Sequence, residues 1–257
     1  MTNTFIPEHE VYGFLSAVGI KTPRYYFVDD EARVADAPFV SGDPVVLKGI
    51  ARDLWHKSEA GALAFCDFDA AAVASMHGRM REQVGQSHEW LGTLVAERVA
   101  FKRAGNAPSE IFVSLQRDQC CGAIVSVGFG GLLTEDWARE LKQSLLVWPV
   151  SAYTPQEAFE ELSSHWLGKV LLGKLRQEKP LITGESVLDF LEKLWKLDEL
   201  MAREQLGLLE MNPLVVDSAG DIVALDGVGL RSAESHVEPC PVPLQDDSFL
   251  NPRRIAL

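Results

Sequence analysis

Alternating and periodic apolar positions divide this chain into short strands and amphipathic helices. Two apolar runs, residues 208–216 and 222–225, flank the polar sequence Asp-Ser-Ala-Gly-Asp. This pattern predicts a β-hairpin whose turn contains a glycine. Further apolar runs predict strands over residues 24–28, 44–49, 91–99, 110–115 and 122–127.

Helical periodicity separates these strands. A first helix is predicted to begin at Pro7 and to end near Gly19, because proline favours the first helical position and glycine follows helix ends. Asp69 is expected to cap a second helix and Thr154 a third, and a fourth spans residues 184–206. The apolar stripe predicted to be buried in the third helix comprises Phe159, Leu162, Trp166 and Val170. Strands that alternate with helices predict an α/β fold.

Composition narrows the class of protein. The chain has 257 residues, enough for one large or two small domains, and 47% apolar residues supply a core. A net charge of −13 argues against non-specific binding of nucleic acid and against an acidic membrane surface. The first ten residues lack the pattern of a signal peptide, and no apolar run is long enough to span a membrane. The cysteines, which have no metal-motif spacing, predict reduced thiols in a cytoplasmic protein; they are Cys66, Cys120, Cys121 and Cys240.

Oxygen-bearing side chains gather in the predicted hairpin. Glu210 and Asn212 are two residues apart, so they share one face of a strand. Asp226 comes back along the second strand, so the three side chains can converge at one end of the hairpin. Hard oxygen ligands suit Mg²⁺, which proteins hold with one or two groups and nucleotide phosphates complete. The alternative is a solvated hairpin end.

Three basic or nucleophilic residues are candidates for phosphate chemistry. Lys48 lies in an otherwise apolar strand, where an ammonium group is costly unless it meets a charge, so it is either a phosphate ligand or a lysine that reaches solvent. Arg176 is either an exposed loop residue or a bidentate phosphate contact. His56 lies in a polar loop, where a single histidine is ordinarily a surface residue.

Several motifs occur in an order that resembles a known family. They are Glu-Met-Asn-Pro-Leu-Val-Val at 210–216 followed by Ala-Leu-Asp, His-Lys-Ser-Glu-Ala-Gly at 56–61, Gly-Phe-Gly-Gly at 128–131 and Gly-Lys-Leu-Arg at 173–176. This order resembles the ATP-grasp β module of the nucleoside-diphosphate-forming acyl-CoA synthetases, which include succinyl-CoA synthetase β subunits and ADP-forming acetyl-CoA synthetases. The resemblance covers about residues 7–231.

The resemblance implies an ATP-grasp fold in which two α/β lobes hold the nucleotide between them. Residues 1–98 would form the N-terminal helix and the first lobe, and residues 99–231 the second lobe. The proline-alternating segment 232–257 would be a linker that leads towards a CoA-binding domain. On this reading the chain is the front part of a longer polypeptide.

Roles follow for individual residues by the same resemblance. His56 would be a transiently phosphorylated phosphate carrier, for which imidazole is suited because it is a neutral nucleophile near pH 7. The nucleotide would be bound by Lys48, Glu97, Val99, Glu110 and Arg176, with Glu97 to Val99 at the adenine. Mg²⁺ would be held by Asn212 and Asp226, to which the strand spacing described above adds Glu210. Ala62, Cys120-Cys121 and the Asp-Gly-Val sequence from Asp226 depart from the family pattern.

The activity implied is the reaction acyl-CoA + ADP + phosphate ⇌ acid + CoA + ATP, through an acyl phosphate and a phosphohistidine. Mg²⁺ and ATP or ADP would be the cofactors, with GTP or GDP as an open alternative. The expected partner is an α-type CoA-binding and ligase module, in cis or in trans, that brings the CoA thioester and the organic acid; no nucleic acid or membrane is expected, and a homo-oligomer is possible. The departures leave two alternatives: a non-catalytic nucleotide-sensing or partner-docking module, and a carboxylate–amine ligase of the ATP-grasp class.

Overall fold

The computed structural model describes residues 4–52, 54, 57–105, 107–118, 121–140, 144–176 and 179–232. Its strands are β1 (Thr4–Ile6), β2 (Tyr25–Val28), β3 (Pro44–Ala51), β4 (Leu63–Asp67), β5 (Trp90–Glu97), β6 (Ile111–Asp118), β7 (Gly122–Phe129), β8 (Leu145–Pro149), β9 (Leu206–Val216), β10 (Ile222–Ala224) and β11 (Gly227–Arg231). Its helices are α1 (Glu8–Ala17), a 3₁₀ helix (Glu31–Asp36), α2 (Ala70–Val84), α3 (Thr134–Glu140), α4 (Pro155–Ser164), α5 (Trp166–Leu171) and α6 (Gly184–Arg203).

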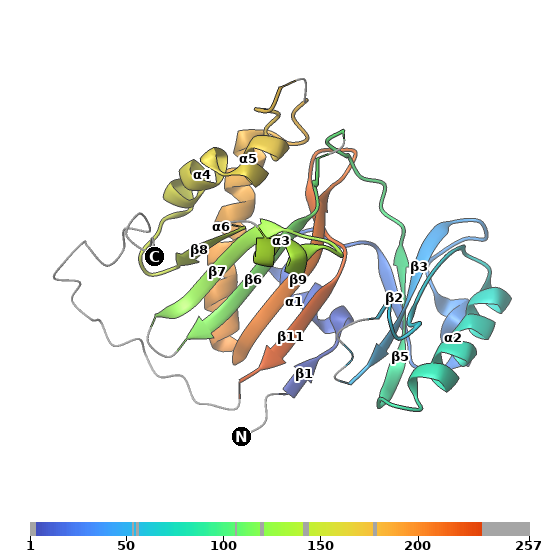
Figure 1. Cartoon of the computed structure of the whole chain (residues 1–257). Helices are drawn as coiled ribbons and strands as arrows, with labels where there is room; N and C mark the ends of the chain where they lie inside the picture. Colours follow the sequence, from blue (N-terminus) through green and yellow to red (C-terminus); the bar gives the residue numbers. More distant parts are fainter. Residues whose placement is uncertain are drawn as a thin grey trace.

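The strands form two sheets, which stand side by side in Figure 1. The larger sheet has seven strands in the order β1-β11-β9-β6-β7-β8, with β10 paired to β9. The smaller sheet has four strands in the order β2-β5-β3-β4. The predicted hairpin is the antiparallel pair β9 and β10, in which Val216 faces Ile222.

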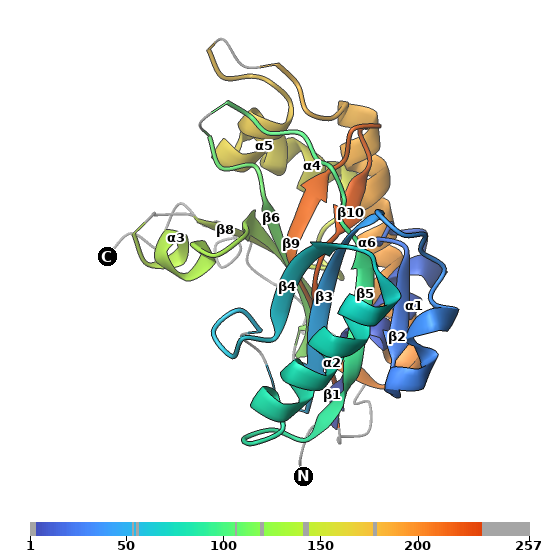
Figure 2. The same cartoon turned by 90° about the vertical axis from the view of Figure 1, so that its right-hand side faces the viewer.

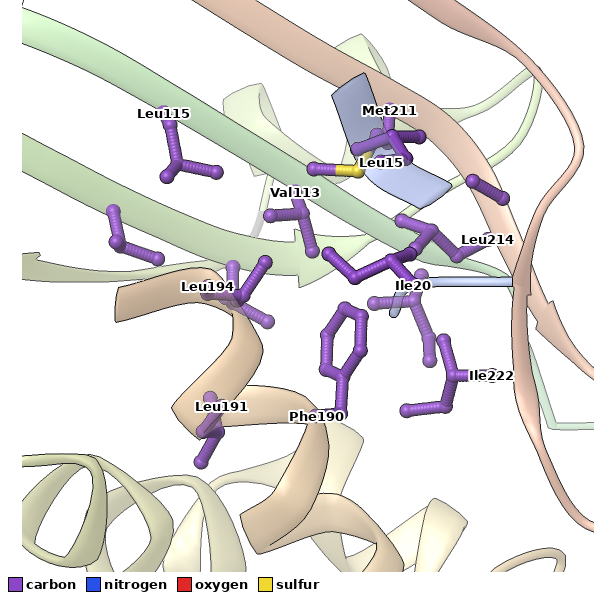
Figure 3. Packing of buried hydrophobic residues seen from close by; sticks show 14 of the residues in the cluster. Leu15, Ile20, Val113, Leu115, Phe190, Leu191, Leu194, Met211, Leu214 and Ile222 are labelled. Carbon is purple, nitrogen blue, oxygen red and sulfur yellow. The ribbon is translucent and has the colours of Figure 1, made fainter. Parts of the chain in front are cut away.

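Helices cover one face of each sheet. Helix α2 packs on the smaller sheet (Figure 2). Its residues Val73, Met80 and Val84 are buried, and the side chain of Asp69 caps its first turn. Helix α6 packs on the larger sheet. Its periodic apolar residues, including Phe190, Leu191 and Leu194, meet the inward-facing residues of β6 and β9 in a continuous core (Figure 3). Each of these two helices is therefore held by an apolar stripe along one face.

The N-terminal elements join the larger sheet. Strand β1 pairs with β11, with Ile6 opposite Gly229, and Leu15 of α1 lies in the core shared with α6 (Figure 3). Close approach of α1 is possible because Gly227 has no side chain: a Cβ there would lie 2.8 Å from Val11 Cγ1. The N-terminal helix, which was expected to precede the first lobe within residues 1–98, thus packs with the larger sheet.

The third predicted helix is interrupted at His165. Its extended backbone (φ −73°, ψ 156°) ends α4, and its side chain accepts a hydrogen bond from the amide of Leu167 at the start of α5. This break turns Trp166 away from the core, so that 54% of it is exposed, and its predicted burial is wrong. Among the described residues, no helix is both long and apolar enough to cross a membrane.

Candidate nucleotide and metal site

A pocket of about 410 Å³ lies between the two sheets. The smaller sheet and the connection that follows β5 contribute Val46, Lys48, Leu63, Phe65, Ala96, Glu97, Arg98, Val99, Phe101 and Arg103, and Pro23 also contributes. The residues from the larger sheet and its loops are Glu110, Pro213, Leu225 and Asp226. The lining is largely apolar, and its charged residues include Lys48 and Asp226. The pocket therefore brings together five residues predicted from the sequence: Lys48, Glu97, Val99, Glu110 and Asp226.

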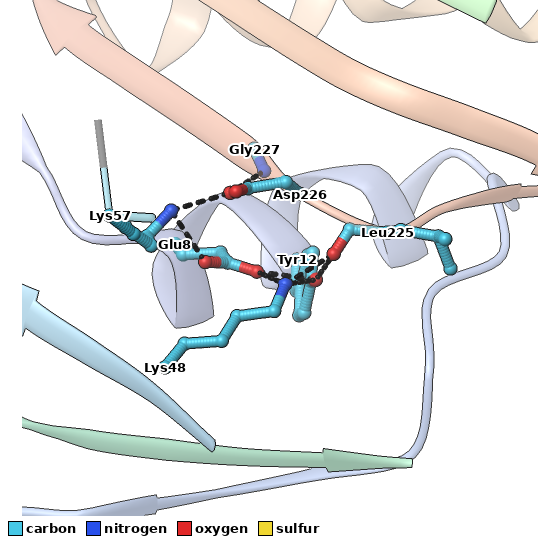
Figure 4. Close-up of polar contacts among 7 residues, drawn as sticks. All are labelled: Glu8, Tyr12, Lys48, Lys57, Leu225, Asp226 and Gly227. Atoms are coloured by element: carbon cyan, nitrogen blue, oxygen red, sulfur yellow. Dashed lines mark hydrogen bonds and ion pairs between the residues drawn. The ribbon is translucent and has the colours of Figure 1, made fainter. Parts of the chain in front are cut away.

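Lys48 is buried and reaches across from the smaller sheet to the larger one. Its ammonium group donates to Glu8 Oε1 at 2.5 Å, to the Tyr12 hydroxyl at 3.3 Å and to the carbonyl oxygen of Leu225 (Figure 4). Glu8 and Tyr12 lie one turn apart on α1, and the Tyr12 hydroxyl is 2.5 Å from Glu8 Oε1. A buried lysine is thus stabilised by a carboxylate and two further acceptors, as burial of an ammonium requires.

A second lysine, Lys57, completes the network. Its ammonium donates to Asp226 Oδ1 at 2.6 Å and forms an ion pair with Glu8 Oε2 at 2.9 Å that is not aligned as a hydrogen bond (Figure 4). Asp226 Oδ1 also accepts from the amide of Gly227 at 2.8 Å. The smaller lobe is here the smaller sheet with α2 and its loops, and the larger lobe is the larger sheet with α1 and α6. Two lysines of the smaller lobe therefore face two carboxylates of the larger lobe at one end of the pocket.

The pKa shifts reflect this crowding of charges. Burial and the charge of Asp226 raise the pKa of Glu8, and the two ammonium groups oppose that shift. Burial would raise the pKa of Asp226, but Lys57 and Lys48 outweigh it and lower the pKa to about 2. Burial would likewise lower the pKa of Lys57, but Asp226 and Glu8 outweigh it and raise the pKa. Asp226 is thus ionised and Lys57 protonated at neutral pH.

The predicted metal ligands lie on β9 and beside it. Burial, and then the charge of Asp226, raise the pKa of Glu210, so these two carboxylates share an electrostatic environment. Asn212 Oδ1 accepts from the amide of Gly131 at 2.8 Å. Gly131 has φ +87°, and a Cβ there would lie 1.9 Å from Glu110 Oε2, so glycine is needed where the loop after β7 approaches Glu110.

These oxygen donors fit Mg²⁺. Among the described residues, no group of three or more His, Cys, Asp or Glu is arranged to hold a metal ion. Mg²⁺ does not require such a cage, because one or two carboxylates together with nucleotide phosphates and water complete its octahedral shell. The carboxylates of Asp226 and Glu210 and the amide oxygen of Asn212 are ligands of the type it prefers.

Four predicted site residues are not among those that line the pocket; two of them, Glu210 and Asn212, lie on β9. His56 lies outside the described residues. Arg176 is exposed in the loop after α5 and is not among the residues that line the pocket, so its phosphate contact stays a prediction.

The sequence reasoning missed Glu8 and Tyr12, and it assigned Lys57 no role in binding. A signal existed for Glu8. It shares one helical stripe with Val11, Tyr12 and Leu15, so that a carboxylate falls on the buried face of α1. An acid in that position is costly unless a cation meets it.

Two sheets that enclose a pocket, with lysines and oxygen donors at one end, define the ATP-grasp class of fold. A family model described as the ATP-grasp domain matches residues 2–228. The chain therefore belongs to the ATP-grasp domain family, and the predicted α/β ATP-grasp fold of two lobes is confirmed.

Relatives of known activity agree with the resemblance found in the sequence. The chain is 26% identical over 220 residues to the ADP-forming acetate–CoA ligase II of Archaeoglobus fulgidus. The matched region covers 84% of this chain and 29% of that relative. It is 25% identical over 217 residues to the ADP-forming 4-hydroxybutyrate–CoA ligase of Nitrosopumilus maritimus, covering 83% of this chain and 29% of the relative. The chain thus spans under a third of the length of these relatives.

A solved structure shows the same fold. It is the dinucleotide-forming acetyl-coenzyme A synthetase 1 of Ca. Korarchaeum cryptofilum in complex with coenzyme A, Ca-AMPCP and HgCl⁺. The TM-score is 0.70 at 22% identity, over 89% of this chain and 94% of that chain.

Proposed function

We propose that this chain is the nucleotide-binding part of a nucleoside-diphosphate-forming acyl-CoA synthetase. It would transfer a phosphoryl group between ADP or ATP and a histidine, in a reaction that interconverts acyl-CoA and the free acid. The observation that carries the proposal is the interlobe pocket, which is apolar along most of its wall and carries Lys48 and Asp226 together. The curated relatives named as ADP-forming CoA ligases support this reaction class.

The apolar part of the pocket suits a purine base. Phe65 and Phe101 line it, and Arg98 and Arg103 lie over their rings at 5.7 and 5.2 Å. At the connection between the lobes, the amide of Glu97 already donates to a backbone carbonyl at 2.8 Å, and that of Arg98 does so at 3.0 Å. Among the residues predicted to meet the adenine, we therefore propose the backbone amide of Val99 as the contact to the base.

The other end of the pocket suits the phosphates. Lys48 and Lys57 provide positive charge, and Asp226, Asn212 and Glu210 are the residues that would hold Mg²⁺. The ion would neutralise charge on the transferring phosphoryl group, where catalysis rests on positioning and electrostatics. An entering phosphate has to share the ammonium of Lys48 with Glu8, because three acceptors already surround it.

His56 is proposed as the phosphate carrier. Its covalent neighbour Lys57 lies against Asp226 at the phosphate end of the pocket, which supports this role. A structure of the Korarchaeum enzyme is described as containing a phosphorylated phosphohistidine segment. The imidazole would accept the phosphoryl group as a nucleophile and release it to an acid bound elsewhere.

The rest of the reaction belongs to a partner. The chain spans under a third of its curated relatives, so the CoA thioester and the acid would be bound by an α-type module, in cis or in trans. Homo-oligomer formation and use of GTP or GDP belong to the same proposal.

Titration calorimetry with ADP, with GDP and with and without Mg²⁺ tests nucleotide binding. Mg²⁺ is expected to increase the affinity of the wild type for the nucleotide. The double substitution Asn212→Ala with Asp226→Ala is expected to remove this increase. Asp221→Ala, a change at an exposed carboxylate in the turn of the same hairpin, is the control and should bind like the wild type. Unchanged Mg-nucleotide binding in the double variant would show that the metal site is wrongly placed.

Labelling tests the carrier role. With γ-labelled ATP, and with the α-type module added where turnover requires it, the wild type should acquire an acid-labile, base-stable label. His56→Ala should lose this label and His88→Ala should keep it. Equal labelling of His56→Ala would refute the phosphohistidine and favour a carboxylate–amine ligase or a sensor.

A further inference from the structure

Glu8 is a carboxylate inside the molecule for which the proposed reaction has no direct use. Only 1% of it is exposed, and both of its oxygens face lysines that come from the other lobe (Figure 4). The Tyr12 hydroxyl, 2.5 Å from Oε1, fixes the carboxylate from its own helix. Glu8 is thus held in place on every side by groups that the fold supplies.

The network contains equal numbers of opposite charges. Lys48 and Lys57 contribute two positive charges, and Glu8 and Asp226 contribute two negative ones. If Glu8 were neutral, both ammonium groups would face Asp226 alone. The network would then carry one net positive charge, which would repel a divalent cation beside Asp226.

The two carboxylates contact the lysines differently. Glu8 binds Lys48 through Oε1 at 2.5 Å and Lys57 through Oε2 at 2.9 Å. Asp226 meets Lys57 with Oδ1, which also accepts from Gly227. Oδ1 of Asp226 is therefore occupied by two protein donors, and the same residue lines the pocket.

Stability alone does not account for such a network. A buried ion-pair cluster contributes about as much to folding as apolar residues of the same volume, or less. The placement of four charges at the phosphate end of the pocket therefore favours a role in ligand binding.

We infer that Glu8 is a positioning residue for the metal site: it is the internal counter-ion of Lys48 and Lys57, and it keeps the network neutral so that a divalent cation can approach Asp226. The inference rests on the proposed function. It assigns to the N-terminal helix a part in Mg²⁺ use that acts through the lysines.

The test is the affinity for ADP measured by calorimetry with and without Mg²⁺. Glu8→Gln keeps the shape of the side chain and adds one positive charge to the network. Metal-free ADP should then bind about tenfold more tightly, because its phosphates meet a network with a net positive charge. The factor by which Mg²⁺ increases the affinity for ADP should fall about tenfold. If Glu8 had only a structural role, Glu8→Gln would lower the affinity for ADP both with and without Mg²⁺.

A second variant restores the charge balance. In Glu8→Gln with Lys57→Met, one lysine and one aspartate remain, so the enhancement by Mg²⁺ should return to within about threefold of the wild type. This recovery is expected even if Glu8→Gln alone fails to fold, because the double variant removes the unpaired charge. Glu10→Gln, an exposed carboxylate on the same helix, is the matched control and should behave like the wild type.

The outcomes separate the two proposals. Undiminished enhancement by Mg²⁺ in Glu8→Gln, or no recovery in the double variant, would overturn the role of Glu8 while leaving nucleotide binding intact. Absence of ADP binding in the wild type would overturn the proposed function and, with it, this inference.

Discussion

The buried contact between Lys48 and Glu8 yields the sharpest prediction about stability. Lys48→Met keeps the apolar stem but removes an ammonium group bound to Glu8, Tyr12 and the Leu225 carbonyl. Removing one partner of a buried ion pair costs about 3–5 kcal/mol, because the other charge stays buried. Since Glu8 keeps its ion pair with Lys57 at 2.9 Å, we expect about 3 kcal/mol, the lower end of this range.

A double-mutant cycle isolates this contact. Glu8→Gln alone should also cost about 3 kcal/mol, whereas Lys48→Met with Glu8→Gln removes both charges and should cost about 1–2 kcal/mol in total. Urea unfolding followed by tryptophan fluorescence gives the three free energies. The control is Lys21→Met, because the pair of Lys21 with Asp221 is about half exposed, and its loss should cost less than about 1 kcal/mol.

Two outcomes of the cycle would refute a stabilising ion pair between Lys48 and Glu8. If the two single changes add up to the cost of the double change, Lys48 and Glu8 do not stabilise one another, and the ion pair across the lobes contributes nothing measurable. If Lys21→Met costs as much as Lys48→Met, burial is not the source of the effect.

Three further predictions concern other positions. Gly131→Ala should destabilise the fold by about 1–3 kcal/mol, because it places a Cβ against Glu110 at a positive φ. Gly78→Ala, the control, lies in a helix with open space around it and should stabilise the fold by about 0.5–1 kcal/mol. Thermal unfolding of both variants tests this difference. Burial lowers the pKa of His77 below its usual 6.5, so this histidine binds a proton more readily in the unfolded chain than in the folded one. The free energy of unfolding should therefore be largest above about pH 6.5 and should fall as the pH drops further. In urea titrations between pH 7.5 and 5.5, His77→Leu should flatten this fall. Phe65→Ala should weaken ADP binding about tenfold or more and leave unfolding unchanged within about 0.5 kcal/mol, because the ring is 60% exposed at the pocket; equal affinity would remove Phe65 from the base site.

Much of the architecture follows from local patterns in the sequence. The strand and helix periods predict the hairpin of β9 and β10, the capped helices and the apolar face of α6, because each depends on residues a few positions apart. The order of short motifs carries the family resemblance. Lys48 stands out for a related reason, since a single ammonium group in an apolar strand has to meet an opposite charge.

What the tertiary structure decided concerns residues far apart in the chain. Glu8 and Lys48 are separated by 40 positions, and Lys57 and Asp226 by 169, so no local pattern links them. Their meeting depends on α1 crossing to the larger sheet, where Gly227 makes room for Val11. The exposure of Trp166 likewise depends on the break at His165. Periodicity reports which face of an element is apolar, whereas the partner of a buried charge is selected only when the two lobes come together.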